Sequence, residues 1–206
     1  MGKMDEMIIV AKREAVFHGE ALAFQGVETT KEKVTEIVEA ISSTYEVMRR
    51  GDAEENPLYK QPIPYAVMRK GEEVFMYRRL AGGGETRLHD KLSIGVGGHM
   101  NDISDADTFQ DVLMENLRRE LEEELMIEAS SQDINFIGLI NDDANEVGRV
   151  HIGLLVIIEL PEDAVVEVRE KDQLEGKWVT VNELVNPDVY EKLESWSQIA
   201  TNSLKE

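Results

Sequence analysis

A run of charged and apolar residues near the middle of the chain constrains the fold more than any other segment. Residues 118–127 read Arg-Arg-Glu-Leu-Glu-Glu-Glu-Leu-Met-Ile, and they continue a pattern in which leucine recurs every fourth residue. The leucines are Leu113, Leu117, Leu121 and Leu125. This spacing predicts an amphipathic helix over about residues 109–125 whose apolar stripe packs against a core. Glu120, Glu123 and Glu124 stand at i, i+3 and i+4, so they project together from a neighbouring side of that helix.

The three carboxylates on this side of the helix indicate a cation site. Like charges at this spacing destabilise a helix, and a bound cation offsets their repulsion. Hard divalent cations such as Mg²⁺ and Mn²⁺ prefer oxygen ligands, often shared with the phosphates of a substrate. A solvated acidic face is the simpler alternative, and it suits Glu115 and Glu122.

A glycine-rich segment upstream gives the helix a context. Gly95-Val96-Gly97-Gly98-His99-Met100 follows a β-like run. The two segments together resemble the box of the Nudix hydrolase family, in which a Gly-Gly turn precedes Arg-Glu-apolar-x-Glu-Glu on a helix. Gly97 and Gly98 are similar to the opening turn. The residues that match the second half in register are Arg119, Glu120, Leu121, Glu123, Glu124 and Ile127. The resemblance covers about residues 62–185 and implies an α/β/α sandwich with a mixed sheet.

The segment departs from the family pattern at three places. From Gly98 to Arg119 is 21 positions, about seven more than in the usual box. Counting back from Arg119 puts the family's first glutamate on Asp111, for which we favour a capping role within Thr108-Phe109-Gln110-Asp111. Met126 stands where the family has a glycine that ends the helix, so this helix must end by another route.

The resemblance implies a mechanism that depends on metal-bound carboxylates. It implies that Glu120, Glu123 and Glu124 bind Mg²⁺ or Mn²⁺, and the carbonyl oxygen of Gly98 would be a further ligand. Arg119 resembles the family arginine that orients a metal-binding glutamate, here Glu123. The alternative for Arg119 is an ordinary ion pair worth roughly 0.2–0.5 kcal/mol. Divalent cations polarise phosphoryl oxygens, activate water and orient the substrate, so we assign catalytic roles to Arg119, Glu120 and Glu123.

The general base is the least defined part of this site. Many family members use a glutamate on a loop near the metals, and Glu146, between two predicted strands, is our candidate. His99 and His151 are alternatives, although a lone histidine at a strand edge is commonly structural. Glu120 could itself act as the base.

Arginines upstream of the glycine-rich segment are candidates for substrate binding. Arg78, Arg79 and Arg87 form a locally basic region in an acidic chain. The planar donors of a guanidinium suit phosphate oxygens, so we expect one of the three to contact substrate phosphate. Surface solubility is the alternative role.

Composition restricts the partners. Lys and Arg total 22 against 42 for Asp and Glu, a net charge of −20, which argues against nucleic acid or an anionic membrane as partner. A phosphorylated small molecule is compatible, because a bound metal inverts the local charge. The absence of cysteine excludes disulfides and a cysteine nucleophile. It also excludes the prenyl diphosphate isomerases of the same fold, which rely on a catalytic cysteine. Neither an 18-residue apolar stretch nor a signal-peptide pattern occurs, so we expect a cytoplasmic protein.

The N-terminal 60 residues lie outside the family resemblance. Residues 7–11 read as a strand and residues 30–49 as a helix, which could bury its apolar stripe against a second subunit in a homodimer. Residues 51–60 form a polar connection. We therefore predict an N-terminal extension over residues 1–60, packed on or dimerising with a Nudix-type domain over residues 61–206.

The remaining elements alternate irregularly, which favours a mixed sheet flanked by helices. The expected strands span residues 63–68, 73–78, 92–96, 134–140, 150–160 and 177–179, and a terminal helix spans residues 189–204. Together these observations predict an enzyme that hydrolyses a phosphoanhydride bond in a nucleoside diphosphate linked to another moiety, or in a related pyrophosphate compound. The alternative is a non-catalytic module that binds a nucleotide or nucleotide-sugar and regulates a partner. The lengthened loop and altered box ends keep that alternative open.

Overall fold

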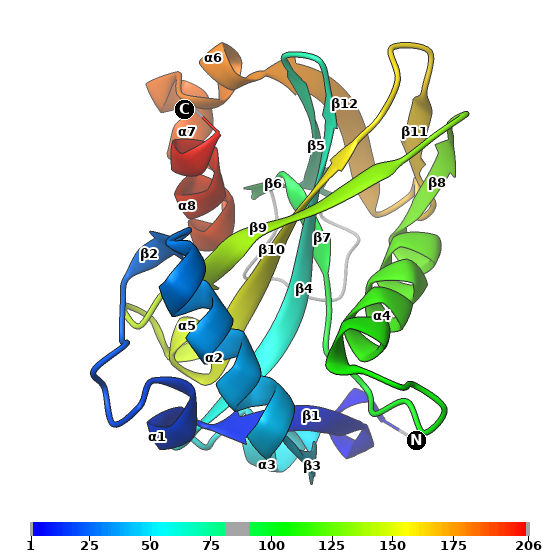
Figure 1. Cartoon of the computed structure of the whole chain (residues 1–206). Coiled ribbons are helices and arrows are strands. Elements are labelled where there is room, and N and C mark those ends of the chain that lie inside the picture. The colour runs from blue at the N-terminus through cyan, green and yellow to red at the C-terminus, as the bar shows by residue number, and fades with distance from the viewer. Residues whose placement is uncertain (1, 81–90, 205–206) are drawn as a thin grey trace. The chain divides into compact units, whose positions relative to one another are not determined.

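The computed structural model describes residues 2–80 and 91–204, apart from the side chain of Arg79 (Figure 1). The chain forms two compact units, each built from three segments. The first unit comprises Met1–Pro64, Gly98–Arg118 and Ile137–Leu155. The second comprises Tyr65–Gly97, Arg119–Phe136 and Val156–Glu206. Contacts between distant segments therefore define each unit.

Eight elements among the described residues lie entirely within the first unit. They are η1 (Lys3–Asp5), β1 (Met7–Lys12), α1 (Arg13–Val16), β2 (Gly26–Glu28), α2 (Lys31–Thr44), β3 (Glu46–Arg49), α3 (Arg50–Ala53) and α5 (Glu146–Val150). Four further elements contribute residues to both units. They are β4 (Tyr59–Lys70), α4 (Phe109–Glu124), β9 (Asp133–Asn141) and β10 (His151–Glu159).

The second unit contains the remaining strands and the C-terminal helices. They are β5 (Glu73–Arg79), β6 (Leu92–Ser93), β7 (Gly95–Gly97), β8 (Leu125–Glu128), β11 (Val165–Val168), β12 (Leu174–Thr180), α6 (Val181–Leu184), α7 (Pro187–Tyr190) and α8 (Ser195–Ser203).

The main sheet has the strand order β12-β5-β4-β10-β9-β2. In the first unit, β1 pairs antiparallel with β3 and with the start of β4, and β2 pairs with the end of β9. In the second unit, β5 pairs antiparallel with β12, β4 and β6, and β8 forms a separate ladder with β11. The α/β class with a mixed sheet and helices is therefore confirmed, together with the N-terminal strand and helix.

The first unit has a core in which helix α2 packs by its apolar stripe. Val34, Ile37 and Ile41 of α2 are buried with Leu139 of β9 and Leu113 of α4. All four leucines of the predicted α4 stripe are buried as well. Since the stripe of α2 is covered within the chain, the observation on which we based a homodimer loses its force.

The predicted helix over residues 30–49 is too long at its C-terminal end. It ends at Thr44, and residues 46–49 form strand β3 along β1. The hydroxyls of Ser43 and Thr44 donate to the carbonyls of Glu39 and Ala40, which are the bonds by which such residues weaken a helix interior.

The expected strand over residues 92–96 is interrupted at Ile94. Leu92–Ser93 pairs with β5 and Gly95–Gly97 pairs with β4. A Cβ on Gly95 would lie 2.1 Å from the ring of Tyr65, so only glycine permits this approach of the two strands.

The end of α4 explains how the helix stops without the family's glycine. The chain passes directly into β8, where Met126 pairs with Glu167 of β11. Arg169 donates its backbone N–H to the carbonyl of Glu124 and its Nε to the carbonyl of Leu125. These bonds occupy carbonyls that a helix end leaves without helical partners.

Two further expectations need correction. The segment before β10 is not only a loop, because residues 146–150 form α5. The expected helix over residues 189–204 is divided into α7 and α8, since Leu92 of β6 exchanges backbone hydrogen bonds with Lys192 and Glu194. No helix among the described residues is long and apolar enough to cross a membrane.

Candidate functional site

The last turns of α4 carry the predicted metal ligands, and we call Arg119 with Glu120, Glu123 and Glu124 the acidic turn. Arg119 Nη1 lies 2.8 Å from Glu120 Oε1 and 3.4 Å from Glu123 Oε1. Glu120 is buried, with 8% of its surface exposed, whereas the Glu123 side chain is 60% exposed. One guanidinium therefore contacts two of the three carboxylates, including the Glu123 expected from the sequence.

The other residues expected at the metal and substrate sites are placed as follows. Gly98 comes directly after β7, whose Gly97 pairs with Tyr65. Arg78 is exposed and forms a cross-strand ion pair with Glu175 at 3.0 Å. The side chain of Arg79 and the whole of Arg87 lie outside the described residues.

The proposed base Glu146 is an exposed residue in the first turn of α5. Its helix is capped by Asn145, whose side chain accepts from the backbone N–H of Gly148. The next residue, Val147, has a structural connection to a histidine. The Nδ1 of His151 donates to the carbonyl of Val147 at 2.7 Å. Helix α5 thus fixes the ring of His151.

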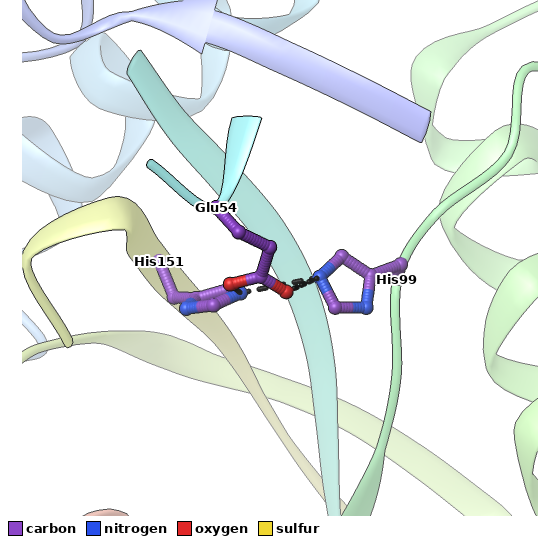
Figure 2. A group of neighbouring side chains, drawn as sticks. All are labelled: Glu54, His99 and His151. Carbon is purple, nitrogen blue, oxygen red and sulfur yellow. Dashed lines mark hydrogen bonds and ion pairs between the residues drawn. The ribbon is translucent and has the colours of Figure 1, made fainter. Parts of the chain in front are cut away.

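His99 and His151 lie together in the first unit, beside a carboxylate that we did not consider from the sequence. Figure 2 shows Glu54 between the two imidazole rings. The Nε2 atoms of the histidines are 3.2 Å apart, and they lie 3.4 Å (His99) and 3.9 Å (His151) from Glu54 oxygens. We call these three residues the histidine cluster. Within the described residues they are a group with the composition and spacing to hold a metal ion.

Burial and mutual contact set the protonation of this cluster. Burial lowers the pKa of His151 to about 4, and the neighbouring His99 acts in the same direction. The hydrogen bond from His99 lowers the pKa of Glu54 to about 2, in spite of the partial burial of that carboxyl. At neutral pH the cluster therefore contains an ionised carboxylate and a neutral His151.

A buried lysine holds the chain on either side of α5. Lys60 is fully buried, and its Nζ, with three N–H donors, lies 2.7 to 3.1 Å from four acceptors, which are Asn141 Oδ1, Asp143 Oδ1 and the carbonyls of Gly148 and His151. Burial lowers the pKa of Lys60 to about 8, although its bond with Asp143 acts against this.

Arg13 completes this network from α1. Its guanidinium contacts both carboxylate oxygens of Asp143, at 3.0 and 2.8 Å. Burial raises the pKa of Asp143, but the hydrogen bonds from Arg13 and Lys60 outweigh burial and hold that pKa well below its usual range. The network therefore fixes the backbone that carries His151.

Sequence reasoning considered the two histidines one at a time and did not consider Glu54. That glutamate lies in the polar segment that we interpreted as a connection, 45 positions before His99. No short spacing links the three residues. The available signal was compositional. The chain has only four histidines, and two of them lie at the ends of predicted strands: His99 follows the strand over residues 92–96, and His151 lies at the start of the strand over residues 150–160.

Solved structures of other proteins share the fold of this chain. No family model matches the chain. The crystal structure of Tm1382, described as a candidate Nudix hydrolase, aligns with a TM-score of 0.77 and 28% identity over 97% of this chain and 98% of that chain. DR0079 from Deinococcus radiodurans aligns at a TM-score of 0.50 and 16% identity over 71% of this chain and 83% of its own, which shows a shared fold alone.

The chain therefore shares the fold of a candidate Nudix hydrolase over nearly its whole length, and this likeness supports the resemblance stated from the sequence. The match to Tm1382 extends beyond residues 62–185, since it includes nearly the whole N-terminal segment. Protein YmaB of Bacillus subtilis (strain 168) is 56% identical over 206 residues, with 100% of both chains covered. The chain belongs to the same family as Protein YmaB.

Proposed function

We propose that this protein hydrolyses a phosphoanhydride bond in a nucleoside diphosphate linked to another moiety, or in a related pyrophosphate compound, with Mg²⁺ or Mn²⁺ bound at the acidic turn. The observation that carries the proposal is the sharing of one guanidinium by Glu120 and Glu123. An arginine placed between two carboxylates fixes their positions and leaves oxygen atoms for a cation.

The donor set of the acidic turn suits a hard divalent cation. Its three carboxylates offer oxygen ligands only, and they outnumber the arginine beside them. Glu120 is buried, and burial of a carboxylate is costly unless a positive charge accompanies it. The residues present therefore fit Mg²⁺ or Mn²⁺ better than a softer metal.

The residues of the acidic turn divide two tasks in this proposal. Glu120, Glu123 and Glu124 hold the cation, with the Gly98 carbonyl as a further oxygen, and Arg119 keeps Glu120 and Glu123 in position. When bound, the cation supplies charge neutralisation and a water of lowered pKa. Glu146 or Glu120 would accept the proton of the attacking water, and Arg78, Arg79 or Arg87 would bind substrate phosphate.

Substitution at the acidic turn tests the proposal. We expect E123Q and E124Q to lower metal-dependent turnover roughly 100-fold or more, because metal stabilisation of phosphoryl charge is worth several kcal/mol. The measurement is product release from a panel of nucleoside diphosphate derivatives with Mg²⁺ or Mn²⁺. The matched control is E122Q, on the exposed side of the same helix, which should retain turnover.

Two outcomes would contradict this function. Full metal-dependent turnover by E123Q and E124Q would remove the acidic turn from the mechanism. Saturable binding of a nucleotide or nucleotide-sugar without turnover on any compound would favour the regulatory module, which the longer segment between Gly98 and Arg119 still permits.

A further inference from the structure

The histidine cluster joins three parts of the chain that are far apart in sequence. Glu54 follows α3, His99 follows β7, and His151 begins β10, so each of the three segments of the first unit supplies one residue. Their ligand atoms all lie within 4.8 Å of one another. The side chains of His99 and His151 are 10% and 8% exposed, and that of Glu54 is 23% exposed.

The distances within the cluster match the coordination geometry of a small metal ion. Metal–nitrogen and metal–oxygen bonds of about 2.0–2.2 Å at tetrahedral angles place neighbouring ligand atoms about 3.3–3.6 Å apart. The three separations here are 3.2, 3.4 and 3.9 Å. A single ion could therefore contact all three residues with side-chain movements of a few tenths of an ångström.

The hydrogen-bonding of the cluster is unbalanced, because several acceptors share one N–H. His151 uses its Nδ1 proton on the Val147 carbonyl, and its Nε2 faces the Nε2 of His99 at 3.2 Å. Glu54 Oε1 and Gln61 Oε1 also lie within 3.4 Å and 2.7 Å of His99 Nε2. One nitrogen carries at most one proton, which cannot satisfy three acceptors well. A cation among these atoms would satisfy them together.

A buried amide supports the same interpretation independently. Gln61 is fully buried, and its Nε2 has no hydrogen-bond partner among the described residues. Leaving a buried donor unpaired is costly, and natural proteins keep such groups where they have a task. Here the task is to aim the amide oxygen into the cluster, where it can supply a fourth ligand.

The ligand types select the class of metal. Imidazole nitrogens favour Zn²⁺ and neighbouring transition metals, whereas Mg²⁺ prefers oxygen ligands alone. Two histidines and one glutamate, with the His151 ring held by a carbonyl through its other nitrogen, make a recognised zinc donor set. We propose that Glu54, His99 and His151 bind one Zn²⁺ or similar transition-metal ion. This site shares no residue with the acidic turn.

Metal at this site would cross-link the first unit. Because the three ligands come from its three segments, binding requires those segments to be folded together, and it should therefore raise the midpoint of thermal unfolding. The effect does not depend on turnover, so it can be measured whether or not the acidic turn is catalytic.

The test is metal binding by the full chain after treatment with a chelator. We expect one Zn²⁺ per chain by elemental analysis and a chelator competition titration. H99N, H151N and E54Q should each weaken Zn²⁺ binding about 10-fold or more, since each removes a ligand. The control is H18N, which changes an exposed histidine at φ 48°, a conformation that asparagine tolerates. It should bind Zn²⁺ as the unaltered protein does.

Two further measurements keep the outcome decisive if a ligand variant fails to fold. X-ray absorption of the unaltered protein loaded with Zn²⁺ should show imidazole ligands, and Co²⁺ should give the visible spectrum of a tetrahedral site. A doubly altered protein, E123Q/E124Q, should retain Zn²⁺ binding. Oxygen-only ligation, loss of Zn²⁺ binding in E123Q/E124Q, unchanged affinity in the three ligand variants, or no Zn²⁺ bound by the unaltered chain would each overturn the proposal.

Discussion

The acidic turn and the histidine cluster are both groups of polar side chains, but they are assembled in opposite ways. The acidic turn comes from six consecutive residues of one helix, whereas the histidine cluster draws Glu54, His99 and His151 from three separate segments. The acidic turn includes the largely exposed Glu123, while the two histidines are nearly buried. A helix alone creates the first arrangement, and only the completed first unit creates the second.

This difference has consequences for stability. Exposed ion pairs on a helix are worth little, because water and salt screen them. Buried polar groups depend on all of their partners, and removal of one leaves the others uncompensated. The histidine cluster and the Lys60 network beside it should therefore be sensitive to substitution, whereas the exposed Glu123 of the acidic turn should tolerate it.

The largest expected effect on stability comes from removing the buried positive charge of Lys60. K60M keeps the length of the side chain but leaves Asn141, Asp143 and two carbonyls without their donor. We expect a loss of about 3 kcal/mol in the free energy of unfolding, near the lower end for a broken buried pair because Arg13 still contacts Asp143. Urea denaturation gives the value. K12M, at an exposed lysine at the end of β1, should change it by less than about 0.5 kcal/mol; equal effects of the two substitutions would refute the structural role of Lys60.

A smaller effect should appear as a pH dependence. The pKa of Asp143 is held below its ordinary value of 3.8 by Arg13 and Lys60. In acid the unfolded chain protonates this carboxyl before the folded chain does, so the contribution of Asp143 is complete above about pH 4 and is lost as pH falls below that. Unfolding free energies measured from neutral pH into acid should therefore fall more steeply for the unaltered protein than for D143N. D172N, at an exposed aspartate, should follow the unaltered protein, and parallel curves for D143N would contradict the argument.

The acidic turn was predictable from sequence because its information is local. The leucine spacing fixed which side of α4 is buried, and the glutamates follow from the same periodicity. The expected strands that correspond to β1, β4, β5, β9, β10 and β12 lie within a few residues of the observed ones for the same reason, whereas β2, β3, β8 and β11 were not expected. The strand break at Ile94 was not, because it depends on the close approach of Gly95 to the Tyr65 ring.

The histidine cluster was not predictable because nothing local distinguishes its members. Glu54 follows a short helix in a polar segment, and a glutamate there is ordinarily a solvated residue. Its proximity to His99 depends on β1, β3 and β4 bringing the N-terminal segment into the first unit. The end of α4 was likewise hidden from sequence, since Arg169 reaches its carbonyls from 45 positions beyond Glu124.

The smallest expected effect gives the sharpest contrast between the two regions. E123Q removes an exposed contact of 3.4 Å with Arg119, and Glu120 still pairs with that guanidinium at 2.8 Å. We expect the free energy of unfolding to change by less than about 0.5 kcal/mol, while turnover falls roughly 100-fold because a metal ligand is lost. Denaturation and turnover should be measured on the same preparation. A large destabilisation would mean that lost activity reports unfolding, and the acidic turn would then resemble the histidine cluster in depending on every member for the fold itself.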